Sequence, residues 1–404
     1  MRAPALRRAA VLSLAGAAVA LTTWMWSRSP APADPRQALQ RLVSDAVAAD
    51  PSIRNCVVSV AIGDGSFEWT GAAGAAHVQG PVAMTPDTPI YVASVTKLYV
   101  AAVIMALSER HALSLDDPMA KYLPSDLIRG IHVYRGRDHS GEITIRQLLS
   151  HRSGIGDYYD DPGPDGKSLF ERFVAEPHRR WTVDETIDRA RQLPAKFEPG
   201  TQTSYSDTNF QLLGKLIEAV TRRPLDAVLD EALFTPLDLE HTWLVGHPRS
   251  PAQSAAQPAD VFAGERDITP SRANGAYWAD GGIVSTAREM NLFLRALADG
   301  RVVGRESLRQ MQQWHHWRIP LDYGLGMMRF DLPQPLARAV GMPTLWGHSG
   351  STGSFVYRSD ALNLFIAGTV DQTDSRARPF VLMRNVVRVV ESLPRDRSDA
   401  SRSP

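Results

Sequence analysis

Cysteine and net charge are both nearly absent from this chain. Cys56 is the single cysteine among 404 residues, which excludes an intrachain disulfide. It precedes the apolar run 57–62, so we expect it to pack in the core as a small apolar residue. The 44 Lys and Arg residues balance the 44 Asp and Glu residues. No overall field therefore attracts nucleic acid or an anionic surface.

Residues at metal-ligand spacing are missing as well. Eleven histidines occur, but only His315 and His316 are adjacent, in a tryptophan-flanked segment that we interpret as a loop without suitably spaced carboxylates. We therefore expect no metal ion and no cofactor. The chain does have apolar material, since 44% of its residues are hydrophobic, and this is enough for a large core in a globular protein.

Residues 1–33 have the composition of an export signal. Arg2, Arg7 and Arg8 precede an apolar stretch at 9–23, and the small residues at 31–33 offer a cleavage site. The rival interpretation is a retained membrane anchor, because the apolar stretch and the tryptophans behind it approach spanning length. The arginine pair also permits twin-arginine export. All of these interpretations predict an exported protein that is periplasmic or extracellular, either free or anchored to the cytoplasmic membrane.

Strand and helix patterns divide the rest of the chain into blocks. Residues 57–62 and 67–70 have strand patterns on either side of a glycine turn, and together they predict a hairpin. Helical patterns dominate from 98 to about 273, with a long loop expected at 158–177. Strand patterns return near the C-terminal end, at 323–330, 354–358 and 364–370. A last helix is expected at 379–391.

This order predicts an α+β domain at 34–393. Its antiparallel sheet is built from both chain ends and flanked by helices, and a mostly helical subdomain, about 98–273, is inserted between the two halves of the sheet. Residues 394–404 are charged and poor in apolar side chains, so we expect a disordered tail. The start of the insertion forms a seam between the two parts, where ligand sites preferentially occur.

A serine and a lysine lie at this seam, as Ser94-Val95-Thr96-Lys97. Lysine is scarce in the chain, and no other lysine has a serine three residues upstream. Residues three apart on a helix share a face, so the Lys97 amine can reach the Ser94 hydroxyl. The apolar run that follows predicts a buried helix, in which a desolvated lysine can activate a serine. The plain alternative is a helix-capping serine beside a surface lysine.

Two further segments favour the catalytic interpretation. Tyr205-Ser206-Asp207 leads into a helix, and His348-Ser349-Gly350-Ser351 leads into a strand. Together with Ser94 and Lys97 they resemble the ordered motifs of the serine beta-lactamase and penicillin-recognising family, which are Ser-x-x-Lys, Tyr-x-Asn and Lys/His-Thr/Ser-Gly. The segments 143–155 and 281–287 agree with that family too, and the resemblance runs from about residue 40 to 392. It implies a beta-lactamase/transpeptidase-like fold.

The resemblance also implies a role for each motif residue. Ser94 would attack a carbonyl and form an acyl-enzyme, with Lys97 and Tyr205 as the two candidates to shuttle its proton. The backbone N–H groups of Ser94 and Ser351 would form the oxyanion hole. Ser349 and Gly350 would hold the substrate against the strand edge. His348, at the position of a lysine in class C beta-lactamases, would bind a substrate carboxylate or polarise Tyr205.

Asp207 departs from the family pattern, which mostly has asparagine there. A carboxylate accepts hydrogen bonds but does not donate unless it is protonated, so Asp207 can bind Lys97 but not a substrate amide carbonyl. We therefore expect Asp207 to contact substrate or Lys97 and to favour the charged form of the lysine. The structural alternative is that Ser206 or Asp207 simply caps the next helix.

We therefore expect an exported serine hydrolase that acts through an acyl-enzyme on Ser94. Its first expected activity is that of a D-alanyl-D-alanine carboxypeptidase on cell-wall peptides or related amides. An esterase or a class C-like beta-lactamase with the same site is the second hypothesis. A weakly active penicillin-binding sensor or accessory cell-wall protein is the third, because of Asp207. Its expected partners are small-molecule or peptide substrates.

Overall fold

The computed structural model describes residues 34–80, 82–272, 275–374 and 377–393. The expectations for 1–33 and 394–404 lie outside these residues. Within the described ranges, no helix combines the length and the apolar composition needed to cross a membrane.

One antiparallel sheet of nine strands organises the molecule, in the order β11-β12-β13-β14-β15-β16-β1-β2-β3. The N-terminal part contributes β1 (Asn55–Ile62), β2 (Glu68–His77) and β3 (Val82–Ala83). The C-terminal part contributes β11 (His315–Arg318), β12 (Leu321–Tyr323), β13 (Met328–Phe330), β14 (Leu345–Ser349), β15 (Phe355–Ser359) and β16 (Leu364–Thr369). The two parts join where β1 pairs with β16, from Val57 opposite Thr369 to Ile62 opposite Leu364. The predicted single sheet from both chain ends is confirmed.

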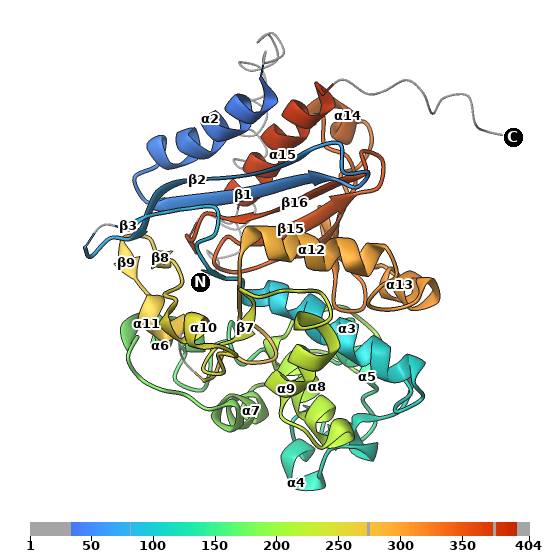
Figure 1. The fold of residues 1–404 in the computed structure, drawn as a ribbon. Helices are drawn as coiled ribbons and strands as arrows, with labels where there is room; N and C mark the ends of the chain where they lie inside the picture. Colours follow the sequence, from blue (N-terminus) through green and yellow to red (C-terminus); the bar gives the residue numbers. More distant parts are fainter. Residues whose placement is uncertain (1–33, 81, 273–274, 375–376, 394–404) are drawn as a thin grey trace, which may run out of the picture.

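Amphipathic helices cover both faces of this sheet. Helices α2 (Pro35–Ala48) and α15 (Arg378–Glu391) lie side by side on one face, and α12 (Ala287–Ala298) lies on the other (Figure 1). Cys56 of β1 is fully buried in the core beneath α2 and α15, as predicted. The layers therefore bury the sheet on both sides.

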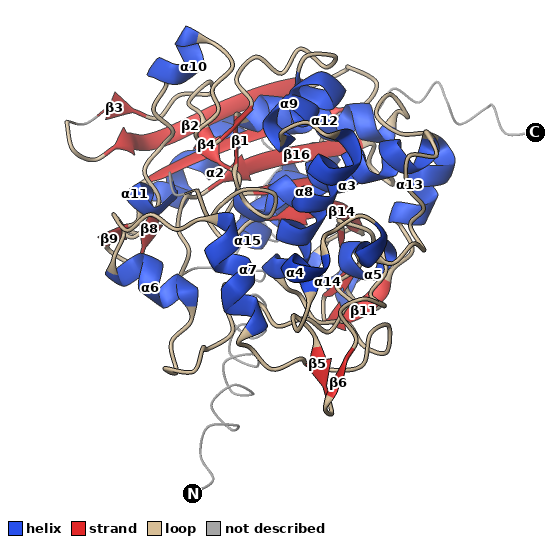
Figure 2. Ribbon diagram, turned by 90° about the horizontal axis from the view of Figure 1, so that it is seen from below, coloured by secondary structure: helices blue, strands red, loops and turns tan. Residues whose placement is uncertain are grey.

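The region between β3 and α12 is mostly helical and lies below the sheet (Figures 1 and 2). Its helices are α3 (Thr96–Glu109), α4 (Ser125–Ile128), α5 (Ile145–Leu149), α6 (Leu169–Ala175), α7 (Val183–Arg191), α8 (Asp207–Thr221), α9 (Leu225–Leu229), α10 (Pro251–Ala255) and α11 (Thr269–Arg272). Its short strands are β4 (Ile90–Tyr91), β5 (Val133–Tyr134), β6 (Arg137–Asp138), β7 (Trp243–Leu244), β8 (Phe262–Ala263), β9 (Arg266–Asp267) and β10 (Ile283–Ser285). Two short helices, α13 (Arg305–Met311) and α14 (Leu336–Val340), come later in the chain.

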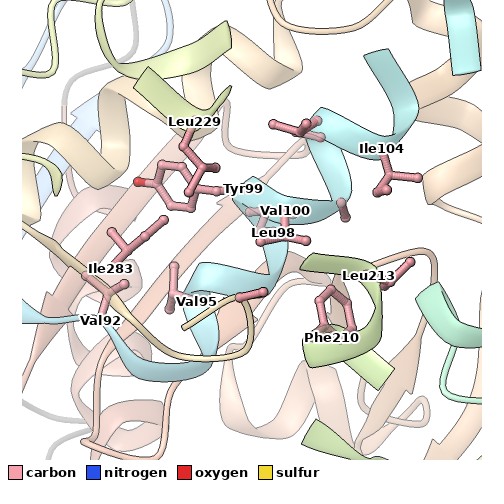
Figure 3. Close-up of a cluster of buried hydrophobic side chains, with 14 of the residues drawn as sticks. Val92, Val95, Leu98, Tyr99, Val100, Ile104, Phe210, Leu213, Leu229 and Ile283 are labelled. Atoms are coloured by element: carbon pink, nitrogen blue, oxygen red, sulfur yellow. The ribbon is translucent and has the colours of Figure 1, made fainter. Parts of the chain in front are cut away.

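Helix α3 is the centre of the helical part. Every side chain from Thr96 to Met105 is buried, which confirms the buried helix predicted from its apolar sequence. Figure 3 shows its side chains packing towards Phe210 and Leu213 of α8 on one side and towards Leu229 and Ile283 on the other. Tyr99 also stacks on Phe293 of α12 with ring centroids 3.7 Å apart. The helix that starts after Ser94 is therefore held from several directions.

Three local predictions differ from the structure. The expected loop at 158–177 contains α6, whose start is fixed by a capping box between Ser168 and Glu171. His315 and His316 lie in β11, at the edge of the sheet, instead of in a loop. The single strand expected at 323–330 is two strands, because the chain turns through Gly326 with a φ of 72° between them.

Candidate active site

Ser94 lies in the 3₁₀ turn Ala93–Val95, which connects β4 to α3. Ala93, directly before it, has a φ of 47°, in the left-handed region that costs a non-glycine residue about 1–2 kcal/mol. Such conformations occur where the surrounding structure over-determines the backbone, often at active sites. Ser94 is partly exposed and lines a cavity of about 310 Å³.

The Lys97 side chain is fully buried, which excludes the alternative of a surface lysine. Its Nζ donates to Ser94 Oγ at 3.0 Å and to the Asp280 backbone carbonyl at 2.6 Å, and it also binds the Asp207 carboxylate. Burial by itself lowers the pKa of Lys97, but the negative charges of Asp207 and Asp280 outweigh it, so the pKa is raised. The resting site therefore contains an ammonium group hydrogen-bonded to the candidate nucleophile.

Tyr205 lies just before α8, with its ring centroid 5.1 Å from Lys97 Nζ. Its hydroxyl is buried and makes no hydrogen bond of regular geometry to any described residue. Burial, and next the charge of Asp207, raise the Tyr205 pKa well above its usual value, although the nearby Ser94 hydroxyl lowers it. The ring stacks on Trp317 with centroids 5.3 Å apart and packs at a tilt against His151 with centroids 4.2 Å apart. The phenol is therefore neutral at rest and close to Ser94.

Asp207 is the first residue of α8 and does not cap it with its side chain. Ser206 occupies the N-cap position, but its hydroxyl donates to the Gly156 carbonyl at 3.0 Å and makes no capping hydrogen bond. The Asp207 carboxylate binds Lys97 instead. The capping alternative is therefore wrong for both side chains, and the expected contact between Asp207 and Lys97 is present.

The turn after β14 packs against the segment that leads into Ser94. Thr352 Oγ1 donates to the Tyr91 carbonyl at 2.9 Å, and Ser354 Oγ donates to the Val92 carbonyl at 2.7 Å. A Cβ at Gly350 would lie 2.5 Å from the Val92 oxygen, so only glycine allows this approach. Ser349, Gly350 and Ser351 line the same cavity as Ser94. The turn thus places Ser351 at the wall of the same cavity as Ser94.

His348 does not reach the cavity. Its side chain is fully buried, with Nδ1 donating to the Ser349 carbonyl at 2.8 Å and Nε2 accepting from the Tyr323 hydroxyl at 2.9 Å. Burial, reinforced by the charge of Lys97, lowers the His348 pKa to about 3, so the ring is neutral at physiological pH. The structure shows neither expected contact of His348, because a buried neutral ring cannot hold a substrate carboxylate and its partner is Tyr323, not Tyr205.

The carboxyl groups of Asp157 and Asp280 belong to the site but were missed in the sequence. The Asp280 carboxylate accepts from the Tyr158 hydroxyl and from the Trp278 N–H at 3.2 Å. Burial, and next Asp207, raise its pKa to about 6. Asp157 follows the segment 143–155 and Asp280 precedes the segment 281–287, and both segments agree with the family in sequence. This proximity was the signal by which the sequence could have indicated the two aspartates.

Aromatic residues from the C-terminal part complete the cavity wall. Trp317 of β11 and Phe380 of α15 line it together with Leu321 and Met328. No pattern in the sequence marks them, because only the folded sheet brings β11 and the start of α15 to Ser94. Among the described residues, no group of three His, Cys, Asp or Glu side chains is arranged to hold a metal ion.

Comparison with known proteins identifies a family and several relatives. The beta-lactamase family profile matches residues 40–387. Penicillin-binding protein 4 of Amycolatopsis lactamdurans is 29% identical over 308 residues, which cover 70% of this chain and 71% of that protein. A putative D-alanyl-D-alanine carboxypeptidase of Escherichia coli K12 is 30% identical over 176 residues, which cover 42% of this chain and 37% of that protein.

A solved structure shares both sequence and fold with the chain. The D-stereospecific amidohydrolase from a Streptomyces species is 28% identical, with a TM-score of 0.66 over 84% of this chain and 95% of that one. The profile spans most of the chain, including the segments that supply Ser94, Lys97 and Tyr205. The chain belongs to the beta-lactamase family and is a serine hydrolase of that family, with carboxypeptidase, amidase and esterase relatives.

Proposed function

We propose that the protein cleaves amides or peptides of D-amino acids through an acyl-enzyme on Ser94. Its first proposed activity is that of a D-alanyl-D-alanine carboxypeptidase on cell-wall peptides or related amides. The observation that carries the proposal is the 3.0 Å hydrogen bond between Lys97 Nζ and Ser94 Oγ at the wall of a cavity. The names of the Escherichia coli and Streptomyces relatives support the substrate class.

The geometry supports the following sequence of steps. Ser94 Oγ attacks the carbonyl carbon of the substrate while its proton passes to Lys97 or Tyr205. The negative charge that develops on the carbonyl oxygen is stabilised by the N–H groups of Ser94 and Ser351. The same proton then moves to the leaving amine, and the acyl group remains on Ser94 as an ester. Water activated by the same base releases the acid and restores the serine.

The charge state at rest decides how readily the first step occurs. Lys97 is protonated and Tyr205 is neutral, so either group must lose a proton before it can accept that of Ser94. Asp207 makes this loss harder for both groups, because its charge stabilises the ammonium and destabilises a phenolate. An asparagine at this position would have neither effect.

Asp207 specifically favours ester hydrolysis as a second candidate function. Its ionised carboxylate cannot donate to a substrate amide carbonyl. An activated ester needs less base assistance, because its leaving group departs without taking up a proton. We therefore propose esters as the substrates that this site turns over most readily.

Export is part of the same proposal and rests on the sequence of residues 1–33. The arginines followed by an apolar stretch and small residues support a signal peptide or a membrane anchor. A periplasmic or extracellular position, free or anchored to the cytoplasmic membrane, would give the site access to cell-wall peptides.

One assay panel tests these proposals. Hydrolysis of p-nitrophenyl esters, D-amino-acid p-nitroanilides, a D-Ala-D-Ala peptide and nitrocefin is measured side by side, and a fluorescent penicillin tests whether Ser94 can be acylated. We expect turnover of esters and of at least one D-amino-acid amide, together with labelling that Ser94→Ala removes. Labelling without turnover of any substrate would instead favour a penicillin-binding sensor.

A further inference from the structure

The cavity in front of Ser94 has an acidic side. The carboxylates of Asp157, Asp160, Asp161 and Asp207 line it. Lys196 lines the same region but forms an ion pair with Asp161 at 2.8 Å. Aspartates therefore outnumber the basic residues Lys196 and Arg318 in the lining of the cavity.

Asp157 differs from its neighbours because it is almost completely buried, with 2% of its surface exposed. Its Oδ1 accepts from the N–H groups of Tyr159 at 3.0 Å and of Asp207 at 3.1 Å. Its Oδ2 receives no hydrogen bond from any described residue, although the side chain lines the cavity. Oδ2 is not among the buried side-chain atoms that lack a partner, so it is an acceptor that a molecule in the cavity can reach.

The buried charges around this acceptor do not balance. Asp157, Asp207 and Asp280 are all buried, and Lys97 is the buried cation beside them. Lys97 binds the carboxylate of Asp207 and only the backbone carbonyl of Asp280. Burial and the charge of Asp207 raise the pKa of Asp157 well above its usual value. A cation that entered the cavity next to Oδ2 would relieve this excess of negative charge.

Another part of the cavity wall is largely apolar, although Arg318 also lines the cavity. Trp317, Leu321, Met328 and Phe380 form this part, and Tyr205 stacks on Trp317 between this side and Lys97. A volume of about 310 Å³ admits a small molecule. A ligand that satisfies both sides carries an ammonium group and an apolar side chain close to its reactive carbonyl.

We propose that Asp157, through Oδ2, binds the α-ammonium group of the acyl donor, so that the enzyme selects amides, esters and peptides whose acyl amino acid has a free amine. This inference rests on the proposed acyl-enzyme function of Ser94 and narrows its substrates. Of the two substrate classes proposed above, it favours the related amino-acid amides over cell-wall D-alanyl-D-alanine peptides, in which the amine of the acyl residue is already acylated.

The first test compares D-alanine p-nitroanilide with N-acetyl-D-alanine p-nitroanilide on the full chain. Wild type is expected to show at least a tenfold higher kcat/KM for the free amine. Asp157→Asn should lower that ratio at least tenfold, because asparagine keeps an oxygen for the two N–H groups but loses the charge. Asp299→Asn makes the same chemical change on an exposed residue after α12 and should leave the ratio unchanged. Equal turnover of both substrates by wild type, or equal losses in Asp157→Asn, would overturn the inference.

The second test needs no variant, so a folding defect cannot obscure it. D-phenylalanine amide and N-acetyl-D-phenylalanine amide compete with p-nitrophenyl acetate for wild-type enzyme. The free amine should inhibit at least tenfold more strongly, and equal inhibition would contradict a role for the ammonium group. Absence of both ester hydrolysis and penicillin labelling is a different result, since it would remove the proposed function and this inference with it.

Discussion

Replacing Asp207 with asparagine should increase turnover. The carboxylate binds Lys97 inside the protein, raises the pKa of that lysine, and also raises the pKa of Tyr205. Asparagine has nearly the same shape and still accepts a hydrogen bond from Lys97 Nζ, but it carries no charge. Both candidate bases then lose their proton more easily, so the prediction holds whichever of the two accepts the proton of Ser94.

The size of the gain follows from the charge that is removed. Two unit charges about 4 Å apart attract each other by about 4 kcal/mol at an effective dielectric constant of roughly 20. Each ~1.4 kcal/mol changes the population of the deprotonated base about tenfold, which sets a ceiling of roughly three powers of ten. The retained hydrogen bond to the amide offsets about 1 kcal/mol, and the other aspartates still favour the ammonium. We therefore expect kcat/KM near pH 7 to rise about tenfold to a hundredfold.

The assay is a pH–rate profile with a p-nitrophenyl ester and a D-amino-acid p-nitroanilide. The base acts only when it is deprotonated, so activity rises with pH through its pKa, and in Asp207→Asn this rise should move to lower pH. Asp299→Asn serves as the control, because it loses an exposed carboxylate that does not line the cavity, and it should keep the wild-type profile. A folded Asp207→Asn with unchanged or lower kcat/KM and an unshifted profile would refute the electrostatic argument.

Three further results are expected. Ser94→Ala should lower ester and amide turnover at least a thousandfold with unchanged circular dichroism, and persistent turnover would exclude Ser94 as the nucleophile. Tyr205→Phe should lower kcat about a hundredfold or more with a melting temperature close to wild type, because the lost hydroxyl has no regular hydrogen bond to break; a large loss of stability would contradict the position of that hydroxyl. His348 has its pKa lowered from 6.5 to about 3, so the unfolded chain binds the extra proton first and the free energy of unfolding should fall as pH drops below about 6.5, by up to about 1.4 kcal/mol per pH unit. Urea unfolding of His348→Gln should show a shallower dependence on pH, and an identical slope would mean that the fold does not lower the pKa of this histidine.

The parts of the site that the sequence predicted are those fixed by local geometry. The contact between Ser94 and Lys97 depends on one helical turn, and the glycine at 350 on the close approach of a strand end to a turn. His348 was assigned by analogy with the lysine that class C beta-lactamases have at this position, but whether a strand residue faces a cavity or the interior depends on the packing of neighbouring strands. The hydroxyl of Tyr323, on β12, donates a hydrogen bond to His348 Nε2, and no sequence pattern relates the two residues.

The order of strand-rich and helix-rich segments was also predictable, because it depends on local sequence patterns. Apolar runs in the sequence predicted β1, β16 and α3, because each of these elements is buried over most of its length. The position of Asp157 at the cavity was not predictable, because it depends on a hydrogen bond from the Asp207 backbone N–H, at the start of α8, to the Asp157 carboxylate. Nothing in the sequence around Asp157 distinguishes its carboxylate from one exposed to solvent.

The hydroxyls of Thr352 and Ser354, which fix the turn after β14 to Tyr91 and Val92, also determine when the site can form. Ser94 and Lys97 leave the ribosome long before these residues, and β1 gains its second neighbour only when Leu364–Thr369 has been made. An unfinished chain therefore has the nucleophile and its lysine but lacks Ser351 beside them. Synthesis order alone keeps the serine without its proposed oxyanion partner until most of the domain exists, so truncation before β14 should yield an inactive serine, however well the helical part folds.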